Sequence, residues 1–414
     1  MIPEGWTEGK VSDHVVGLES GVSVNGAGRP RHDSEFAVLK VSAVSYGVFD
    51  AQACKVIDGP ELARARTNPK AGQVIISRSN TEDLVGASAY VDSDYPHLFL
   101  PDKLWQTVPR DGANMKWLSY VLASPRNRYK LSLLATGTSG SMKNITMDEL
   151  LSLKVLSPPE GEQLRIAEIL SAWDQAIETT EKLIENSKAQ KKALMQQLLT
   201  GKKRLPGFSN EWSETVLKNI AAVFVSPVNK KSVVGEPAVR LCNYTDVYYN
   251  SHITNSLDFM TATASNSQVE RFTLMKNDLV ITKDSETPGD IAVPALVTEE
   301  LDGVVCGYHL AIIRPDVKVV DGAFLNHLFS QPKVRHYFST RANGATRFGL
   351  TIDGIKEASF MLPGIEEQQK IADVLDTCDQ ELRCLRIILQ QLTMEKRALM
   401  QQLLTGKRRV KVAA

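Results

Sequence analysis

A basic, leucine-rich stretch occurs twice in this chain. Residues 191–204 read KKALMQQLLTGKKR, and residues 396–409 read KRALMQQLLTGKRR. Ten consecutive positions within them, 193–202 and 398–407, are identical at an offset of 205 in a chain of 414 residues. A repeat period close to half the chain length predicts that one structural half-unit is written twice.

Each copy also carries a heptad pattern upstream of this stretch. The first seam consists of Ile166, Leu170, Trp173, Ile177, Thr180, Ile184, Ser187, Lys191, Leu194 and Leu198. The second consists of Ile371, Leu375, Cys378, Leu382, Leu385, Leu389, Leu392, Lys396, Leu399 and Leu403. A four-three spacing keeps such residues on one side of a helix and favours a coiled coil.

We therefore predict two long helices that pair with each other, although the heptad leaves parallel and antiparallel pairing open. A helix over residues 162–200 would be about 57 Å long, which suits a spacer better than the core of one domain. Two unrelated amphipathic core helices are the alternative. Lys191 and Lys396 occupy seam positions, where they either set the register or extend their ammonium groups to solvent.

The bulk composition is that of a globular protein. Hydrophobic residues make up 43% of the chain and charged residues 23%, and the length suggests two to three domains. Five cysteines without CxxC spacing predict a reduced, cytoplasmic protein, and no apolar run is long enough to cross a membrane. The formal net charge of zero argues weakly against a nucleic-acid partner, but the charge is unevenly distributed along the chain.

Outside the heptads, each half predicts mixed α/β structure. Short β-type runs at 73–77 and 278–282 again lie 205 apart, and helical stretches are expected at 115–123 and 322–330. Between such anchors the halves diverge, most clearly at 29–33 against 228–235 and at 84–100 against 288–308. This pattern indicates a common frame around different inserts. It fits two readers of different targets, and also ordinary divergence after duplication.

Catalytic signatures are poor. The sequence Ser157-Pro158-Pro159-Glu160 is similar to the motif with which amino-methyltransferases hold a flipped base, but Glu stands where a ring must stack. No glycine-rich cofactor loop follows a strand, and the seven histidines show no metal-ligand spacing. We therefore expect no catalytic and no metal-binding residues.

Nucleic-acid binding is better supported. The loops at 136–146 and 341–351 combine backbone amides and small hydroxyls, which can approach phosphate, with a cation that can reach a base edge. Each recurs with a basic loop, at 78–80 and 283–285. Ordinary solvated loops are the alternative. The candidate DNA-binding residues are Arg29, Arg31, Arg78, Ser79, Asn80, Thr138, Ser139, Ser141, Lys143 and Asn144, followed by Lys230, Lys231, Lys283, Ser285, Asn343, Thr346 and Arg347.

Two variable regions, each closed by a long helix that begins at Glu-Gln (162–163 and 367–368) and ends at ALMQQLLTGK, resemble the specificity (S) subunit of a Type I DNA restriction-modification system. The resemblance covers essentially the whole chain. It implies an α+β fold in which two mixed α/β target recognition domains are joined by two long helices that form an antiparallel coiled coil, with a pseudo-twofold internal repeat. It divides the chain into domain 1 (1–157), a central helix (158–204), domain 2 (205–362) and a C-terminal helix (363–414).

The resemblance also implies a function and partners. Each domain would read one half of a bipartite, asymmetric site on double-stranded DNA. The helices would set the spacing and dock two modification (methyltransferase) subunits, and restriction subunits would join them in some systems. The chain itself would be non-catalytic and bind no cofactor, because S-adenosylmethionine belongs to the modification subunits. The alternative is a coiled-coil scaffold or DNA-silent homologue that binds only protein. No base-contacting residue is carried over from the family.

Overall fold

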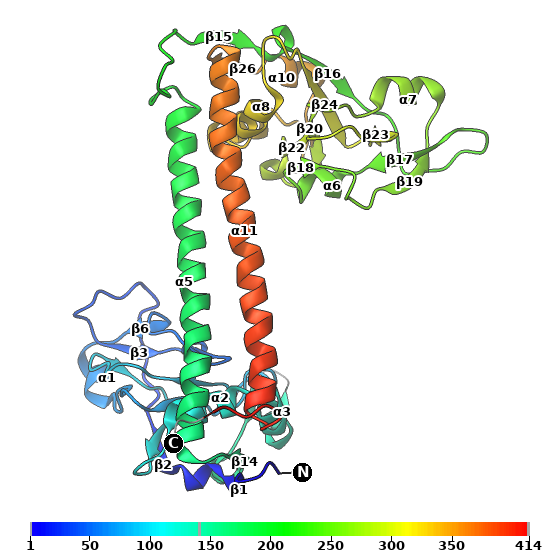
Figure 1. Ribbon diagram of the computed structural model, residues 1–414. Helices are drawn as coiled ribbons and strands as arrows, with labels where there is room; N and C mark the ends of the chain where they lie inside the picture. Colours follow the sequence, from blue (N-terminus) through cyan, green and yellow to red (C-terminus); the bar gives the residue numbers. More distant parts are fainter. Residues whose placement is uncertain (1, 140–141, 412–414) are drawn as a thin grey trace. The chain divides into compact units, whose positions relative to one another are not determined.

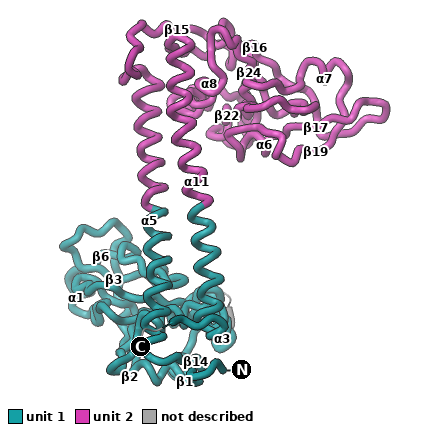
Figure 2. Tube along the Cα trace, viewed as in Figure 1, with its two compact units in different colours: residues 1–181, 388–414 teal, residues 182–387 magenta. Residues whose placement is uncertain are grey.

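The computed structural model describes residues 2–139 and 142–411, with only the backbone for Thr138 and Ser139. The candidate Ser141 lies outside the described residues. The chain forms two compact units (Figure 2): unit 1 consists of residues 1–181 and 388–414, and unit 2 of residues 182–387. Each unit thus contains a stretch of both long helices. The division of the chain into four consecutive domains remains a prediction.

The two long helices are α5 (Glu160–Leu198) and α11 (Ile365–Leu403), each of 39 residues (Figure 1). α5 begins directly after Pro159, and α11 begins two residues after Pro363. Both carry glutamates in the first turn, where the positive end of the helix dipole favours acids. Both end before a glycine in the left-handed conformation: Gly201 has φ +67° and Gly406 has φ +68°. The two predicted helices are confirmed.

Within each unit the stretches of α5 and α11 run antiparallel. In unit 1, Asp174 pairs with Lys396, and Glu162, twelve positions earlier, pairs with Arg409, beyond the end of α11. In unit 2, Lys191 pairs with Asp379, and Arg204, beyond the end of α5, pairs with the earlier residue Glu367. The orientation that the heptad left open is therefore antiparallel, as the family resemblance implied.

Lys191 and Lys396 carry the ion pairs of this seam. The Lys191 ammonium lies 2.5 Å from Asp379, and both side chains are about one-fifth exposed. Lys396 makes the corresponding pair with Asp174. The other predicted seam residues are buried or half-buried along both helices. Since each lysine faces an aspartate on the opposite helix, the pairs fix the register of the helices.

The other strands and α-helices of unit 1 all precede α5 in the sequence. They are β1 (Thr7–Lys10), β2 (Val15–Ser20), β3 (Ala37–Leu39), β4 (Val44–Ser45), β5 (Val48–Phe49), β6 (Cys54–Val56), α1 (Gly59–Arg64), β7 (Val74–Ser77), β8 (Ser79–Asn80), β9 (Ser88–Tyr90), β10 (Leu98–Phe99), β11 (Leu104–Pro109), α2 (Met115–Ala123), α3 (Pro125–Leu134), β12 (Thr136–Ser139), β13 (Met142–Asn144), α4 (Met147–Leu151) and β14 (Lys154–Ser157). The main sheet has the order β2-β11-β7-β9, beside smaller sheets β10-β3-β6, β12-β13-β8, β1-β14 and β4-β5.

Unit 2 repeats this plan between the two long helices. Its elements are β15 (Ser213–Val216), β16 (Ala221–Val225), β17 (Ala238–Cys242), α6 (Tyr244–Tyr248), β18 (His252–Ile253), β19 (Met260–Thr263), α7 (Asn266–Phe272), β20 (Leu279–Thr282), β21 (Asp284–Ser285), β22 (Pro294–Val297), β23 (Val304–Cys306), β24 (Leu310–Pro315), α8 (Gly322–Phe329), α9 (Pro332–Ser339), β25 (Phe348–Gly349), α10 (Ile352–Lys356) and β26 (Ser359–Leu362). Its main sheet has the order β16-β24-β20-β22-β18, beside sheets β19-β17-β23, β21-β25 and β15-β26.

The strand orders show that the duplication extends from the helices into the domains. β7 and β20 coincide with the predicted β runs, and α2 and α8 with the predicted helices. In both units the first strand pairs antiparallel with the last strand before the long helix. These pairs are β1-β14 in unit 1 and β15-β26 in unit 2. The predicted α+β class with an internal repeat is confirmed. Among the described residues no helix is long and apolar enough to span a membrane.

In each unit an arginine beyond the end of one long helix pairs with a buried glutamate at the start of the other. The Glu162 side chain is 3% exposed and receives two hydrogen bonds from Arg409 and one from Trp6 Nε1 at 3.0 Å. Glu367, also 3% exposed, receives a two-pronged contact from Arg204 at 2.6 Å for each nitrogen. In unit 1 this contact binds the C-terminal segment to the N-terminal strand region.

Removing one partner of a seam ion pair should destabilise the fold. We expect Asp379→Ala to lower the free energy of unfolding by about 1–3 kcal/mol, because Lys191 is left without a partner in the seam. The combined change Lys191→Met and Asp379→Leu should restore stability to within about 1 kcal/mol, since apolar residues fill a seam without a desolvation cost. Denaturant unfolding measures both. The exposed Lys370–Asp373 pair is the control: Asp373→Ala should have almost no effect. A double variant no more stable than Asp379→Ala would contradict this role.

The Glu162 contact should depend on pH. Burial alone would raise the pKa of Glu162, but the hydrogen bonds from Arg409 and Trp6 lower it overall. The charged pair therefore contributes stability above the ordinary carboxyl pKa, and this contribution is lost as the pH falls through the lowered value. We expect Glu162→Gln to cost about 1–2 kcal/mol at neutral pH, and the difference from the unaltered protein to shrink at acid pH. Glu168→Gln, at an exposed ion pair with Arg165, should show neither effect.

Candidate nucleic-acid interface

In unit 1 the two polar loops singled out in the sequence meet in one small sheet. Its strand order is β12-β13-β8, so β13 (Met142–Asn144) lies directly beside β8 (Ser79–Asn80). Lys143 is opposite Asn80, and Asn144 is opposite Ser79. Arg78, which joins β7 to β8, accepts a backbone hydrogen bond from Ile145 and donates one to Lys103. The fold thus brings together two candidate segments separated by more than fifty residues.

The side chains of this first sheet differ in what holds them. Lys143 Nζ donates to the carbonyl of Gly137 at 3.1 Å, across its own hairpin. Asn80 Nδ2 donates to Ser77 Oγ at 3.2 Å, and the Arg78 guanidinium lies 5.7 Å from the centre of the Trp105 ring. Ser79 is buried. Lys143, Asn80 and Arg78 are therefore the residues best placed to contact a ligand on this sheet.

Unit 2 repeats the arrangement. β21 pairs with β25, and an isolated bridge between Asn343 and Gly349 extends the pairing. Lys283 stands where Arg78 stands in unit 1: it accepts a backbone hydrogen bond from Leu350 at 3.0 Å and donates one to His309 at 2.9 Å. Arg347 comes immediately before β25 and is exposed, as is Thr346. Ser285 is buried, and its hydroxyl accepts from Tyr244 at 3.3 Å.

Glycine makes both hairpins possible. Gly137 has φ +142° and Gly344 has φ +136°. A Cβ atom on Gly137 would lie 2.4 Å from the carbonyl oxygen of Met142, and one on Gly344 would lie 1.8 Å from that of Arg347. Any other residue would push the two sides of the hairpin apart.

The second sheet carries a polar cluster of Lys283, Asp284, His309 and Arg347, here called the Asp284 cluster. Lys283 Nζ lies 2.6 Å from Asp284 Oδ1, and His309 Nδ1 lies 3.3 Å from Asp284 Oδ2. Arg347 Nη2 lies 3.0 Å from His309 Nε2. Burial lowers the pKa of His309, and so do the charges of Arg347 and Lys283, although the hydrogen bond to Asp284 acts in the opposite direction. The imidazole is therefore neutral near pH 7.

Asp284 and His309 were missed in the sequence. Asp284 stood within the basic loop at 283–285 but was treated as a neighbour of the cations, and His309 was one of seven scattered histidines. His309 comes directly after the divergent segment 288–308, and this proximity was the one available signal. Only the pairing of β20 with β24 brings His309 beside Asp284.

Four other candidates are distant in sequence from the two small sheets: Arg29, Arg31, Lys230 and Lys231. Arg29 makes a two-pronged contact with Glu35, at 2.5 and 2.9 Å, and this hydrogen bonding lowers the pKa of Glu35 to about 2. Arg31 donates to the carbonyls of Asp33 and Glu35. Lys230 and Lys231 are exposed in the loop between β16 and β17. Arg29 and Arg31 therefore shape their own loop, whereas the two lysines are open to solvent.

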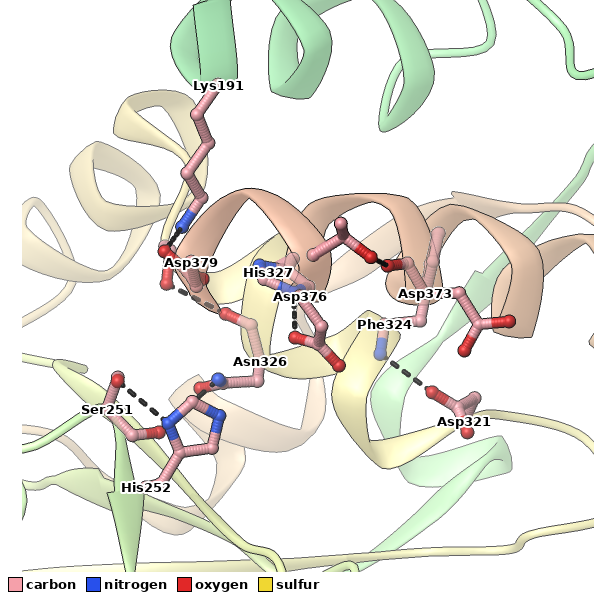
Figure 3. A network of polar contacts seen from close by, with 12 residues as sticks. Lys191, Ser251, His252, Asp321, Phe324, Asn326, His327, Asp373, Asp376 and Asp379 are labelled. Carbon is pink, nitrogen blue, oxygen red and sulfur yellow. Dashed lines mark hydrogen bonds and ion pairs between the residues drawn. The ribbon is translucent and has the colours of Figure 1, made fainter. Parts of the chain in front are cut away.

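One cluster in unit 2 has ligand types that could suit a metal ion. His327, Asp376 and Asp379 offer atoms that all lie within 4.8 Å of one another (Figure 3). Their partners are already present, however: His327 Nε2 lies 2.7 Å from Asp376, and Lys191 pairs with Asp379. Unit 1 has a related junction in which the Tyr120 hydroxyl donates to Asp174 at 2.5 Å. These contacts join α8 and α2 to the long helices, which explains the clusters without a metal.

Comparison with known proteins agrees with this architecture. Residues 22–187 and residues 210–394 each match the family described as Type I restriction modification DNA specificity domain. A Methanocaldococcus jannaschii protein named for the MjaX type I restriction enzyme specificity subunit is 23% identical, over 99% of this chain and 95% of the relative. The MjaVIII specificity subunit of the same organism is 23% identical over 69% of each chain.

Solved structures show the same fold. The S subunit of a Type I restriction-modification system from M. genitalium superposes with a TM-score of 0.61 and 16% identity, over 97% of this chain and 96% of that one. A chain from a type I R-M system, described for its complex assembly and conformational transition, gives a TM-score of 0.57 and 17% identity, over 99% and 100% of the two chains. Because the family match occurs once in each half and takes in most of the sequence, this chain belongs to the family of Type I restriction modification DNA specificity domain proteins.

Proposed function

We propose that this chain is the non-catalytic subunit that gives a Type I restriction-modification enzyme its DNA sequence specificity. Each domain reads one half of a bipartite, asymmetric site, and α5 and α11 set the distance between the halves. One observation carries the proposal: in both units the fold brings a basic loop and a glycine-containing polar loop together in one small sheet. Such a surface offers amides and hydroxyls for phosphate and cations for base edges.

The proposed partners follow from this role. Double-stranded DNA binds the two domains, and two modification subunits dock on the exposed flanks of the long helices. Those subunits supply S-adenosylmethionine and methylate adenine, and restriction subunits join where the system contains them. This chain contributes binding and positioning, with no cofactor of its own.

The most direct test is to express the chain with the methyltransferase encoded beside it and to map methylated adenines across the host DNA. We expect one bipartite motif with two short specified blocks and an unread gap. Methylation that requires the partner but not this chain would contradict the proposal. Failure of the assembled complex to bind DNA in a sequence-dependent way would instead support a scaffold that binds only protein.

Two substitutions should separate the half-sites. We expect Lys143→Ala to relax only one block of the motif and Arg347→Ala only the other, each by about 1–3 kcal/mol at the affected position. Binding to a panel of duplexes with single base changes measures this. An equal loss on all sequences, with a shallower dependence on salt, would assign the residue to phosphate contact instead. Lys218→Ala, at an exposed ion pair with Glu357 outside the long helices and the small sheets, is the control.

The length of the helices should set the gap. Inserting one heptad into α5 after residue 181 and one into α11 after residue 387 lengthens each by about 10 Å, which corresponds to roughly three base pairs. We expect the preferred gap to grow by that amount while the two specified blocks stay the same. A seven-residue insertion in the exposed loop at 229–235 is the control. An unchanged gap would refute the spacer role.

A further inference from the structure

The Asp284 cluster has the chemistry of a guanine reader. We propose that Arg347 contacts a guanine in the half-site read by the second domain, and that His309 and Asp284 position the guanidinium for that contact. This inference rests on the proposed function. It adds the identity of a base and two positioning residues that do not themselves touch the DNA.

The burial of the cluster fits this division of roles. The His309 and Asp284 side chains are 16% and 17% exposed, whereas Arg347 lies on the surface. The backbone of His309 is fixed immediately before β24, because its carbonyl accepts from the Lys283 amide at 2.9 Å. A half-buried imidazole thus contacts one edge of an exposed guanidinium.

Proton positions follow from the neutral state of His309. With its proton on Nδ1, the ring donates to Asp284 Oδ2 and presents a lone pair at Nε2. Arg347 Nη2 lies 3.0 Å from Nε2 and 3.3 Å from Nδ1, and with the proton on Nδ1 only Nε2 can accept its N–H. A protonated ring could not accept this bond. Lys283, which lies 2.6 Å from the other oxygen of Asp284, fixes the carboxylate from the opposite side.

The held guanidinium retains donors for a ligand. Arginine has five N–H groups in a planar fork, and one nitrogen is engaged by His309. In the major groove guanine presents two acceptors, O6 and N7, which a guanidinium can meet together. Adenine presents a donor in place of O6, which a guanidinium cannot accept. Because the side chain is already held, less rotamer freedom is lost on binding.

Two glycines allow Arg347 to approach the cluster. A Cβ atom on Gly349 would lie 2.7 Å from Asp284 Oδ1, and one on Gly344 would lie 1.8 Å from the Arg347 carbonyl. A side chain at either position would displace the hairpin or the carboxylate. The first domain has no such arrangement, because the strand pairing puts Met142 at the position of Arg347 and Ser79 at the position of Asp284. A guanine contact of this kind is therefore expected from the second domain only.

The inference can be tested on the chain assembled with its modification subunits. Once the motif is mapped, each guanine of the site is replaced singly by 7-deazaguanine, which lacks the N7 acceptor, and dissociation constants are measured. We expect one guanine in the second domain's block to lose about tenfold in affinity on replacement. Arg347→Ala should abolish this sensitivity, and His309→Ala should remove most of it. The double variant should have the same affinity and the same sensitivity as Arg347→Ala alone, since both changes remove the same guanine contact.

Two further variants keep the test decisive. His309→Gln retains a donor and an acceptor and should keep more of the sensitivity than His309→Ala, which a merely structural role would not predict. His336→Ala, at an exposed histidine on α9, is the matched control and should behave like the unaltered chain. Losses in His309→Ala that add to those in Arg347→Ala, or that fall on both blocks alike, would overturn the inference.

The two levels of proposal fail in different ways. If Arg347→Ala relaxes a position in the second block that is insensitive to 7-deazaguanine, the guanine assignment is wrong while the reading role stands. If neither Arg347→Ala nor Lys143→Ala changes the preference at any base pair, the proposed reading surfaces are wrong, and the inference falls with them.

Discussion

The ion pairs between aspartate and lysine in the helical seam are the interaction on which the architecture depends. A heptad of leucines and isoleucines would accept several registers and either orientation, because apolar contacts are not directional. A lysine at a seam position is tolerated only where an acid faces it, since an unpaired buried charge is costly. Lys191 with Asp379, and Lys396 with Asp174, therefore select one antiparallel register. Because the sequence is repeated, equivalent ion pairs select the same register in both units.

The same seam ties the domains to the helices. Tyr120 of α2 reaches Asp174, and His327 of α8 reaches Asp376 on the turn before Asp379. Burial and the hydrogen bond to Asp174 raise the pKa of Tyr120, so its hydroxyl remains a donor. The acids thus act in two directions, toward the other long helix and toward a domain helix. Register and domain attachment are parts of one polar network in each unit.

The sequence predicted the frame well because the frame is local and periodic. The heptads, the helix ends and the β runs at 73–77 and 278–282 all depend on residues close in the chain. Orientation depended on pairing between residues about two hundred positions apart, so the heptad alone could not decide it. The loops with Lys143 and Arg347 were found through their recurrence, and the fold pairs each of them with a basic segment. Their contact with DNA stays a prediction. His309 was missed because it comes close to Asp284 only through the pairing of β24 with β20.

The duplicated frame and the diverged loops together explain how one chain can read an asymmetric site. Equivalent strands place Arg78 and Lys283 in equivalent backbone contacts, so each domain can present its loops in the same way. The chemistry presented differs: unit 1 offers an amide, Asn80, and a lysine held by its own hairpin, whereas unit 2 offers an arginine held by a neutral histidine. Amides suit adenine and guanidinium suits guanine in the major groove. A repeated backbone with unequal side chains is therefore sufficient for two different half-sites.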